Sequence, residues 1–159
     1  MSVERVRAYL KQFALEDRLM ELEASSATVE LAAAAIGTEP QRIAKSLTFY
    51  GQDGACIMIV TAGDRRIDNA KFKATLGFKA RMMSAEDALE ATGHAVGGVC
   101  PFALPTGVHG YLDTSVRRFD RVYPAAGSAN SAVALTPDEL ALAVGEAFVW
   151  ADLCKSTEA

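Results

Sequence analysis

The chain has 159 residues, of which 50% are hydrophobic and 23% are charged. This length and composition fit one domain with its own core and are not typical of disordered or low-complexity sequence. Twenty acidic residues against sixteen basic ones give a net charge of −4, which excludes a protein that coats long stretches of nucleic acid but permits a short local contact with RNA.

Cysteine usage and the amino terminus exclude further classes of protein. Cys56, Cys100 and Cys154 are far apart and form no Cys-x-x-Cys motif, so we expect no disulfide framework, no metal site and no cofactor. The first residues mix charged and apolar side chains, unlike a signal peptide, and no apolar run approaches the ~20 residues of a membrane span. We therefore expect a cytoplasmic protein without membrane contact.

The first half of the chain predicts helices followed by a strand hairpin. Thr28 is a good N-cap and Gly37 a good left-handed C-cap for the alanine-rich run between them. The expected elements are an amphipathic helix over 3–13, a helix over 29–36, a helical turn over 39–42, a strand over 43–50, a hairpin turn over 51–54 and a strand over 55–61.

The second half alternates helices, loops and short strands. Thr136 followed by Pro137 and, three residues after the cap, Glu139 is the clearest helix start in the chain. The expected elements are a helix over about 69–76 capped by Asp68, a helix from Ser84 to near Gly93, a strand around 108–112, a strand over 131–135 and a helix from Thr136.

This order of elements predicts an α/β (α+β) fold. We expect a single domain over residues 1–151, with a mixed, mostly antiparallel sheet flanked by helices, because hairpins replace a regular βαβ alternation. Residues 152–159 are expected to form a frayed tail.

Lys45 is the most unusual residue of the strand predicted over 43–50. Alternation places it on the same face as Ile43, Leu47 and Phe49, the face that should point inward. Burial of an ammonium group is costly unless a partner compensates. Two interpretations are open: the side chain extends its amine to water near the strand's end, or it lines a pocket as a cation for a phosphate, a carboxylate or a polarised carbonyl.

Glycine and proline crowd the segment 92–107. Adjacent Gly97 and Gly98 allow a backbone to approach a ligand, and their N–H groups can point at an oxyanion. Pro101 stiffens the residues around it. The apolar residues of this segment favour an ordered loop packed on the core over a mobile one.

A cysteine nucleophile is a further hypothesis. Cys100, with His94 or His109 as a base, has the residue types that nucleophilic catalysis needs. Free cysteine is more often a small core residue, and we rank this hypothesis below the others.

Basic residues concentrate in one stretch of an acidic chain. Residues 65–81 contain one acid, Asp68, and six basic residues, which suit either a solvated face or a few phosphate contacts. The six are Arg65, Arg66, Lys71, Lys73, Lys79 and Arg81. Arg65, Arg66, Lys71 and Lys73 are our candidates for contact with tRNA.

Taken together, these segments resemble the YbaK / prolyl-tRNA-synthetase-associated domain family of trans-acting aminoacyl-tRNA editing proteins. The resemblance spans roughly residues 24–145, and the combination of segments carries it. The segments are TVELAAAAIGTEPQRIAKSLTF (28–49), DRRIDNAKFKATLG (64–77), ATGHAVGGVCPFALP (91–105), GYLDTSV (110–116) and AAGSANSAVALTPDELALAVG (125–145).

The resemblance implies roles for individual residues. Lys45 matches the pocket lysine that the family requires for deacylation, and it would engage either the terminal adenosine phosphate or the ester carbonyl. Gly97 and Gly98, with Pro101 after them, match the glycine loop that holds the aminoacyl ester. Two more substrate-binding candidates are Thr28 at the pocket edge and Asp113, for which a structural or charge-partner role is the alternative.

The resemblance also implies a function and partners. It indicates an enzyme that hydrolyses the ester of mischarged tRNA, in which the substrate's own ribose hydroxyl assists. Its partners would be the acceptor end of that tRNA and, as a second candidate, an aminoacyl-tRNA synthetase. The alternatives are a binding module that holds tRNA ends or a small ligand without turnover, and the Cys100-dependent hydrolase. The sequence leaves open whether the chain is a monomer or a homodimer.

Overall fold

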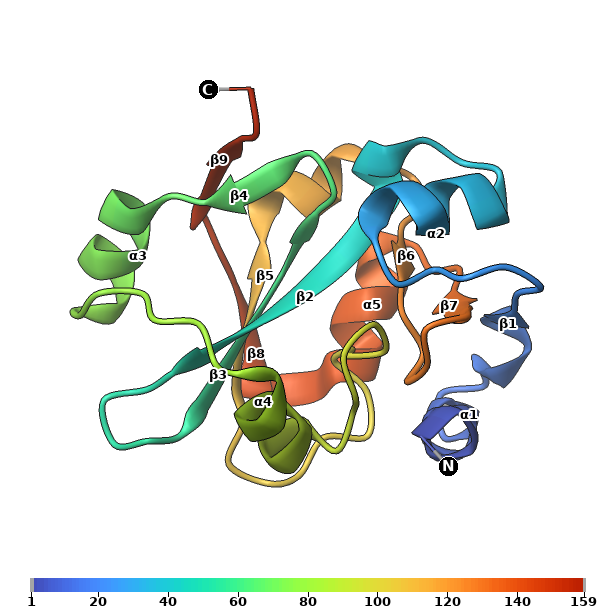
Figure 1. Cartoon of the computed structure of the whole chain (residues 1–159), viewed down its shortest axis with the longest axis horizontal. Helices are drawn as coiled ribbons and strands as arrows, with labels where there is room; N and C mark the ends of the chain where they lie inside the picture. The colour runs from blue at the N-terminus through green and yellow to red at the C-terminus, as the bar shows by residue number, and fades with distance from the viewer. Residues whose placement is uncertain (1, 159) are drawn as a thin grey trace.

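A computed structural model of the chain describes residues 2–158 (Figure 1). Met1 and Ala159, which the predicted domain and tail include, lie outside the described residues. The α-helices are α1 (Ser2–Lys11), α2 (Val29–Ile36), α3 (Asn69–Leu76), α4 (Ala85–Thr92) and α5 (Pro137–Val144). The strands are β1 (Leu19–Glu21), β2 (Ile43–Tyr50), β3 (Cys56–Ala62), β4 (Arg65–Ile67), β5 (His109–Asp113), β6 (Tyr123–Pro124), β7 (Ser131–Val133), β8 (Phe148–Ala151) and β9 (Cys154–Ser156).

Local capping signals place the helices where the sequence predicted them. The Thr28 hydroxyl accepts a hydrogen bond from the Leu31 amide at 3.1 Å, and Gly37 ends α2 with a φ of 86°. Thr136 and Glu139 form a capping box at the start of α5. Within residues 2–158, no helix has both the length and the apolar character that crossing a membrane requires.

The central sheet has five strands in the order β6-β2-β3-β5-β8. The predicted single-domain α/β fold with a mixed sheet flanked by helices is confirmed. The expectation of mostly antiparallel pairing needs correction for this sheet, where only β2 and β3 pair antiparallel and the other three pairings are parallel. The long connections from β3 to β5 and from β5 to β8 allow parallel strands, which a hairpin cannot join.

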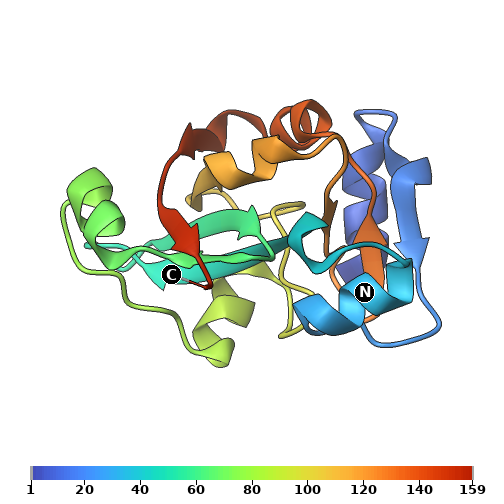
Figure 2. The same ribbon diagram turned by 90° about the horizontal axis from the view of Figure 1, so that it is seen from above.

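Helices cover both sides of this sheet. Figure 2 shows α2 and α4 on one side of the molecule and α5 on the opposite side, with the strands between them. The largest apolar cluster joins α1, α5 and the sheet, and includes Leu10, Met58, Leu112 and Leu140. Two smaller clusters pack α3 and β9 around Phe49, and α2 around Ile43.

Strand β2 has an edge that is covered only at its two ends. At its start, β6 pairs with Ile43 and Ala44 alone. Near its other end, the Met83 amide donates to the Thr48 carbonyl at 2.9 Å. The backbone N–H and C=O of Thr48 therefore point away from β3, toward the free edge of β2. Because backbone direction alternates along a strand, Ser46 directs its N–H and C=O to the same side. Among the described residues, β2 is therefore open at Ser46.

The carboxyl-terminal segment is ordered, contrary to the expected frayed tail. Within residues 152–158, β9 pairs antiparallel with β4, and Leu153 is 0% exposed. Leu153 packs in the cluster that contains Phe72 and Phe49. Burial of this leucine together with Cys154 supplies the anchoring that the polar composition of the last residues does not indicate.

Helix α1 fixes the glycine-rich loop through a buried histidine. His94 is 0% exposed, and its Nε2 lies 2.8 Å from the Phe102 carbonyl oxygen. Since a carbonyl only accepts, Nε2 carries the proton, and Nδ1 accepts from the Ser2 hydroxyl. Arg5, on the same helix, donates to the Gly93 carbonyl at 2.9 Å. The loop 94–102 is thus closed on itself and attached to α1.

The ordered carboxyl terminus gives a first prediction. Leu153→Ala lowers the free energy of unfolding by about 2–4 kcal/mol, since it removes a fully buried leucine from a packed cluster. Urea denaturation measures the change. Glu158→Ala, which alters an exposed residue of the same segment, changes stability by less than about 0.5 kcal/mol. Equal stability of Leu153→Ala and the wild type would restore the frayed-tail interpretation.

The buried histidine gives a second prediction, on pH. Burial lowers the pKa of His94, and Arg5 lowers it further, against the raising effect of the Phe102 carbonyl. The unfolded chain therefore takes up a proton near pH 6.5 that the native state resists, so stability falls as the pH falls from about 6.5 toward the native pKa. Urea denaturation at pH 7.5 and 5.5 measures this loss.

A matched pair of variants isolates the histidine. His94→Gln keeps a donor for Phe102 but does not titrate, so its stability falls less between the two pH values. His109→Gln, at an exposed position, behaves as the wild type. An acid loss of the same size in His94→Gln and wild type contradicts the assignment.

Candidate active site

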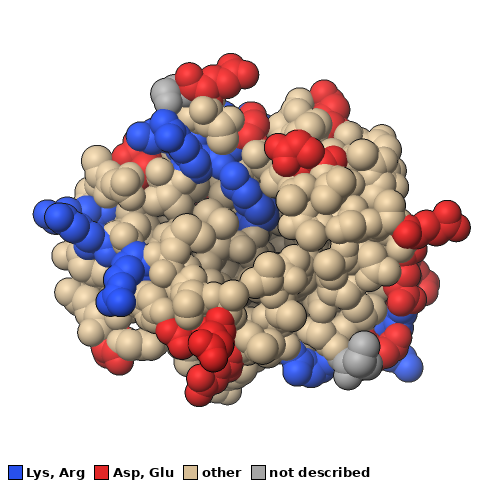
Figure 3. Space-filling model, in the orientation of Figure 1, with Lys and Arg blue, Asp and Glu red and all other residues tan. Residues whose placement is uncertain are grey.

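A pocket of about 420 Å³ lies beside the open edge of β2. Figure 3 shows the molecular surface hollowed near the centre of this face. The walls come from β2, the first residues of α2 and α4, the loop 96–99, and strands β6 and β7. Of the candidate residues, Thr28, Lys45 and Gly97 line this one pocket.

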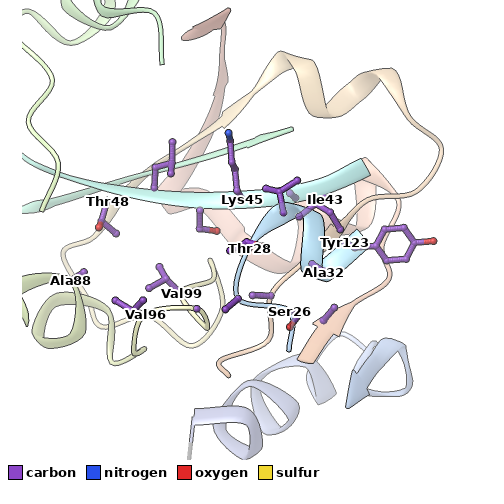
Figure 4. A pocket seen from close by; sticks show the side chains of 18 of the residues that line it. Ser26, Thr28, Ala32, Ile43, Lys45, Thr48, Ala88, Val96, Val99 and Tyr123 are labelled. Carbon is purple, nitrogen blue, oxygen red and sulfur yellow. The ribbon is translucent and has the colours of Figure 1, made fainter. Parts of the chain in front are cut away.

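The pocket has two sides, divided by β2. Figure 4 shows Lys45 on one side of the strand, pointing away from Thr48, Val96 and Val99 on the other. Strand alternation explains this, because Lys45 and its neighbour Ser46 must face opposite ways. The cation and the small-residue part of the pocket are therefore separated by the open edge of β2.

Lys45 is half-buried between two apolar clusters, those of Ile43 and Phe49. Burial lowers the pKa of its amine, and Cys154, followed by the charges of Glu30 and Asp64, opposes that shift. Among residues 2–158 the structure gives this amine no hydrogen-bond or ion-pair partner. A partly desolvated cation of this kind can bind an anionic group without first breaking a salt bridge.

The two glycines of the loop have different tasks. Gly97 has a φ of 87° and lies in the pocket wall, where a Cβ would meet Ala27 and Ala129. Gly98 packs on a second loop: a Cβ there would lie 2.5 Å from backbone atoms of both Gly127 and Ser128. Its amide also donates to the Ala95 carbonyl at 2.9 Å. Gly98 therefore holds two loops together, and its N–H is not available for a ligand.

Like Gly98, two more of the expected substrate-binding residues, Pro101 and Asp113, lie outside the pocket lining. Pro101 is a buried residue of the loop 94–102. Asp113 is 2% exposed, and its carboxylate accepts from the amides of Ser115 at 3.1 Å and Leu153 at 2.8 Å. Asp113 thus joins β5 to the segment before β9, which corresponds to the structural alternative for this residue.

The burial of the Cys100 thiol argues against the hypothesis of a cysteine–histidine nucleophile. Cys100 Sγ lies 3.5 Å from His94 Nε2, so the sequence reasoning correctly paired them. However, Cys100 is 0% exposed, and burial raises the pKa of its thiol to about 12. His94 Nε2 already donates to Phe102, so it cannot act as the base. The pair is part of the core and not a nucleophile.

The basic candidates divide into two groups. Arg65 and Lys71 line a second hollow of about 390 Å³ and form ion pairs with Asp64 and Asp152. Arg66 and Lys73 are exposed. In Figure 3, Lys and Arg side chains gather over β4, β9 and α3 and extend toward the central hollow. Lys155 on β9 lies opposite Arg66 and adds to this basic band, which we define as Arg66, Lys73 and Lys155.

Sequence reasoning missed two pocket residues, Ser26 and Ser46. Both line the pocket with buried hydroxyls that have no hydrogen-bond partner in the described part of the chain. Ser46 could have been found as the neighbour of Lys45 on the opposite strand face, whereas Ser26 lies in a loop without a local signal. Across residues 2–158 there is also no cluster of three or more His, Cys, Asp or Glu side chains suited to a metal ion.

Comparison with known proteins agrees with this geometry. The family model for the aminoacyl-tRNA editing domain matches residues 23–142. The uncharacterised protein YwhH of Bacillus subtilis is 51% identical over 99% of this chain and 100% of its own length. A proline–tRNA ligase of Thermosipho melanesiensis is 38% identical over 48% of this chain, a match that covers 14% of the ligase.

A solved structure described as a candidate trans-editing enzyme for prolyl-tRNA synthetase is similar over nearly its full length. It has a TM-score of 0.86 and 33% sequence identity, and the match covers 98% of each chain. With its fold, its pocket beside Lys45 and the match to the family model, the chain belongs to the aminoacyl-tRNA editing domain family.

Proposed function

We propose that this chain is a trans-acting aminoacyl-tRNA deacylase, which hydrolyses the ester of mischarged tRNA. The observation that carries the proposal is the placement of Lys45, which has no partner among residues 2–158, and a small-residue pocket on opposite sides of an open strand edge. In the reaction, water adds to the ester carbonyl carbon, the bond from that carbon to the ribose oxygen breaks, and the ribose oxygen takes up a proton. The products are the free amino acid and the uncharged tRNA.

The direction of Lys45 favours one of its two suggested roles. An aminoacyl group in the small-residue part of the pocket would place the ester at the edge of β2 and the ribose beyond it. Lys45 points to that outer side (Figure 4). Its amine is therefore better placed for the phosphate of the terminal adenosine than for the ester carbonyl.

Backbone groups are the best candidates for stabilising the transition state. An aminoacyl ester is already activated, so positioned donors and an ordered water suffice where an amide would need more. The outward N–H of Ser46 and the backbone of Gly97 border the pocket where the ester would lie. This arrangement needs no nucleophilic side chain.

The basic band supplies a path for the acceptor stem. Arg66, Lys73 and Lys155 lie on β4, α3 and β9. Lys and Arg side chains gather over these elements to one side of the central hollow (Figure 3). A few phosphate contacts of this kind increase affinity without reading sequence. The partial similarity to proline–tRNA ligases supports a tRNA charged by prolyl-tRNA synthetase as the substrate and that synthetase as a partner.

The role of Lys45 gives a third prediction. Lys45→Ala and Lys45→Met each lower the single-turnover rate on mischarged tRNA by about 100-fold, because each removes one partner of a desolvated charge pair. Both variants hydrolyse an aminoacyl-adenosine without a 5′-phosphate as fast as the wild type does. Quench-flow assays on a panel of mischarged tRNAs and on the nucleoside ester measure these rates.

Each other outcome of that assay has a distinct meaning. Full activity of both variants on tRNA would refute the proposed mechanism. If the variants lose the same factor in rate on tRNA and on the nucleoside ester, Lys45 contacts the ester carbonyl and not the phosphate. If the wild type binds an uncleavable analogue but hydrolyses no ester, the chain is a binding module.

The basic band gives a fourth prediction. Reversal of charge in Arg66→Glu with Lys73→Glu raises KM for charged tRNA about tenfold with little effect on kcat, and makes binding less dependent on salt. Lys11→Glu, the same change at an exposed position on α1, leaves both constants unchanged. Steady-state kinetics at two salt concentrations measures the effect, and an unchanged KM for the double variant excludes an RNA contact there.

A further inference from the structure

Two buried hydroxyl groups in the pocket have no hydrogen-bond partner among the described residues. Ser26 is 8% exposed, and the hydroxyl oxygens of both Ser26 and Ser46 are buried without a hydrogen bond to any residue of 2–158. Their backbones are fixed: the Ser26 amide donates to the Ala129 carbonyl at 2.6 Å, and Ser46 lies in register with Val60 of β3. The orphaned hydroxyls are therefore held in place by the fold.

Four other buried hydroxyls among residues 2–158 do have partners. Thr61 and Ser115 bond to each other at 3.2 Å, Thr92 donates to the Ala88 carbonyl at 2.7 Å, and Ser131 bonds to Ser128 at 2.7 Å. A buried polar group without a partner is destabilising, and native proteins keep few of them. Two in one pocket indicate that their partner is a polar group of the bound molecule.

The remainder of the lining restricts what that group is. Seven alanines make up about a third of the pocket lining, and among the described residues no acidic side chain lines it. The charged residue of the lining, Lys45, points to the other side of β2. The alanines of the lining are Ala27, Ala32, Ala44, Ala85, Ala88, Ala125 and Ala132. The pocket thus suits a small, uncharged side chain.

A hydroxyl group meets these requirements, since it both donates and accepts. Resting on the proposed deacylase function, we propose that Ser26 and Ser46 hold the side-chain hydroxyl of the aminoacyl group, and that the substrate carries a small β-hydroxy amino acid, serine or threonine. An alanyl or 2-aminobutyryl ester would leave both serine hydroxyls unpaired. A site built to bond a substrate hydroxyl rejects the analogue that lacks it more strongly than an apolar pocket rejects an extra methyl group.

The kinetic test compares esters of one tRNA. Seryl, threonyl, alanyl and 2-aminobutyryl esters are assayed with wild type, Ser26→Ala and Ser46→Ala. The wild type prefers the hydroxylated ester of each matched pair, and each variant loses roughly tenfold more kcat/KM on seryl ester than on alanyl ester. A wild type that prefers alanyl ester contradicts the proposal. Equal losses on both esters contradict it too and assign the serines to the α-ammonium group.

A stability measurement separates binding from a structural role. Without ligand, Ser46→Ala raises Tm by about 2–4 °C, because it removes an unsatisfied buried hydroxyl. The control Ser115→Ala, whose hydroxyl is bonded, lowers Tm and keeps the wild-type ratio of seryl to alanyl rates. A lower Tm for Ser46→Ala shows a structural partner and overturns the proposal. Failure of the wild type to hydrolyse any ester refutes the deacylase function itself and is distinct from these outcomes.

Discussion

The open edge of β2 is the constraint on which the site depends. A strand edge inside a fold normally pairs or is covered, because unpaired backbone groups attract other chains. Here β6 covers only the first two residues and the segment before α4 covers the last three, so the backbone of Ser46 lies bare between them. The same gap places successive side chains on opposite sides: Lys45 on one and Ser46 on the other.

The gap persists because the surrounding loops cannot close over it. Gly98 packs directly on Gly127 and Ser128, which sets how near the loop 94–102 comes to the segment before β7. His94 ties that loop to its own end at Phe102 and to α1. The pocket volume is thus fixed by packing at residues outside the pocket lining. The Cys100 thiol belongs to this packing.

Local signals predicted most of the elements of this fold. Thr28, Asp68, Ser84 and Thr136 each cap the helix expected of them, because capping depends on residues within one turn. Five short strands, β1, β4, β6, β8 and β9, were not predicted. Strand β4 shows why: its three residues include two arginines and pair only with the distant β9. The tail prediction was wrong for the same reason: the burial of Leu153 depends on α3 and Phe49, which the sequence of the tail does not show.

The site was predictable where it rests on alternation and not where it rests on long-range packing. Alternation placed Lys45 on the face of Ile43 and Phe49, but whether that face was covered depended on α2 and β9. Asp113 could be picked out from its motif, whereas its bonds to Ser115 and Leu153 required the fold. Ser26 could not be predicted as a site residue, because the pocket that it lines is formed by residues distant in the sequence.

The central claim is that the aminoacyl ester lies across the edge of β2 at Ser46. Amide NMR with an uncleavable amide analogue, a 3′-aminoacylamino-3′-deoxyadenosine 5′-phosphate, tests this most directly. We expect the largest shifts at the amides of Ser46 and Gly97, with a shift of the Lys45 side chain that requires the 5′-phosphate. Shifts centred on the second hollow, at Arg65 and Lys71, with Ser46 unchanged would contradict the account.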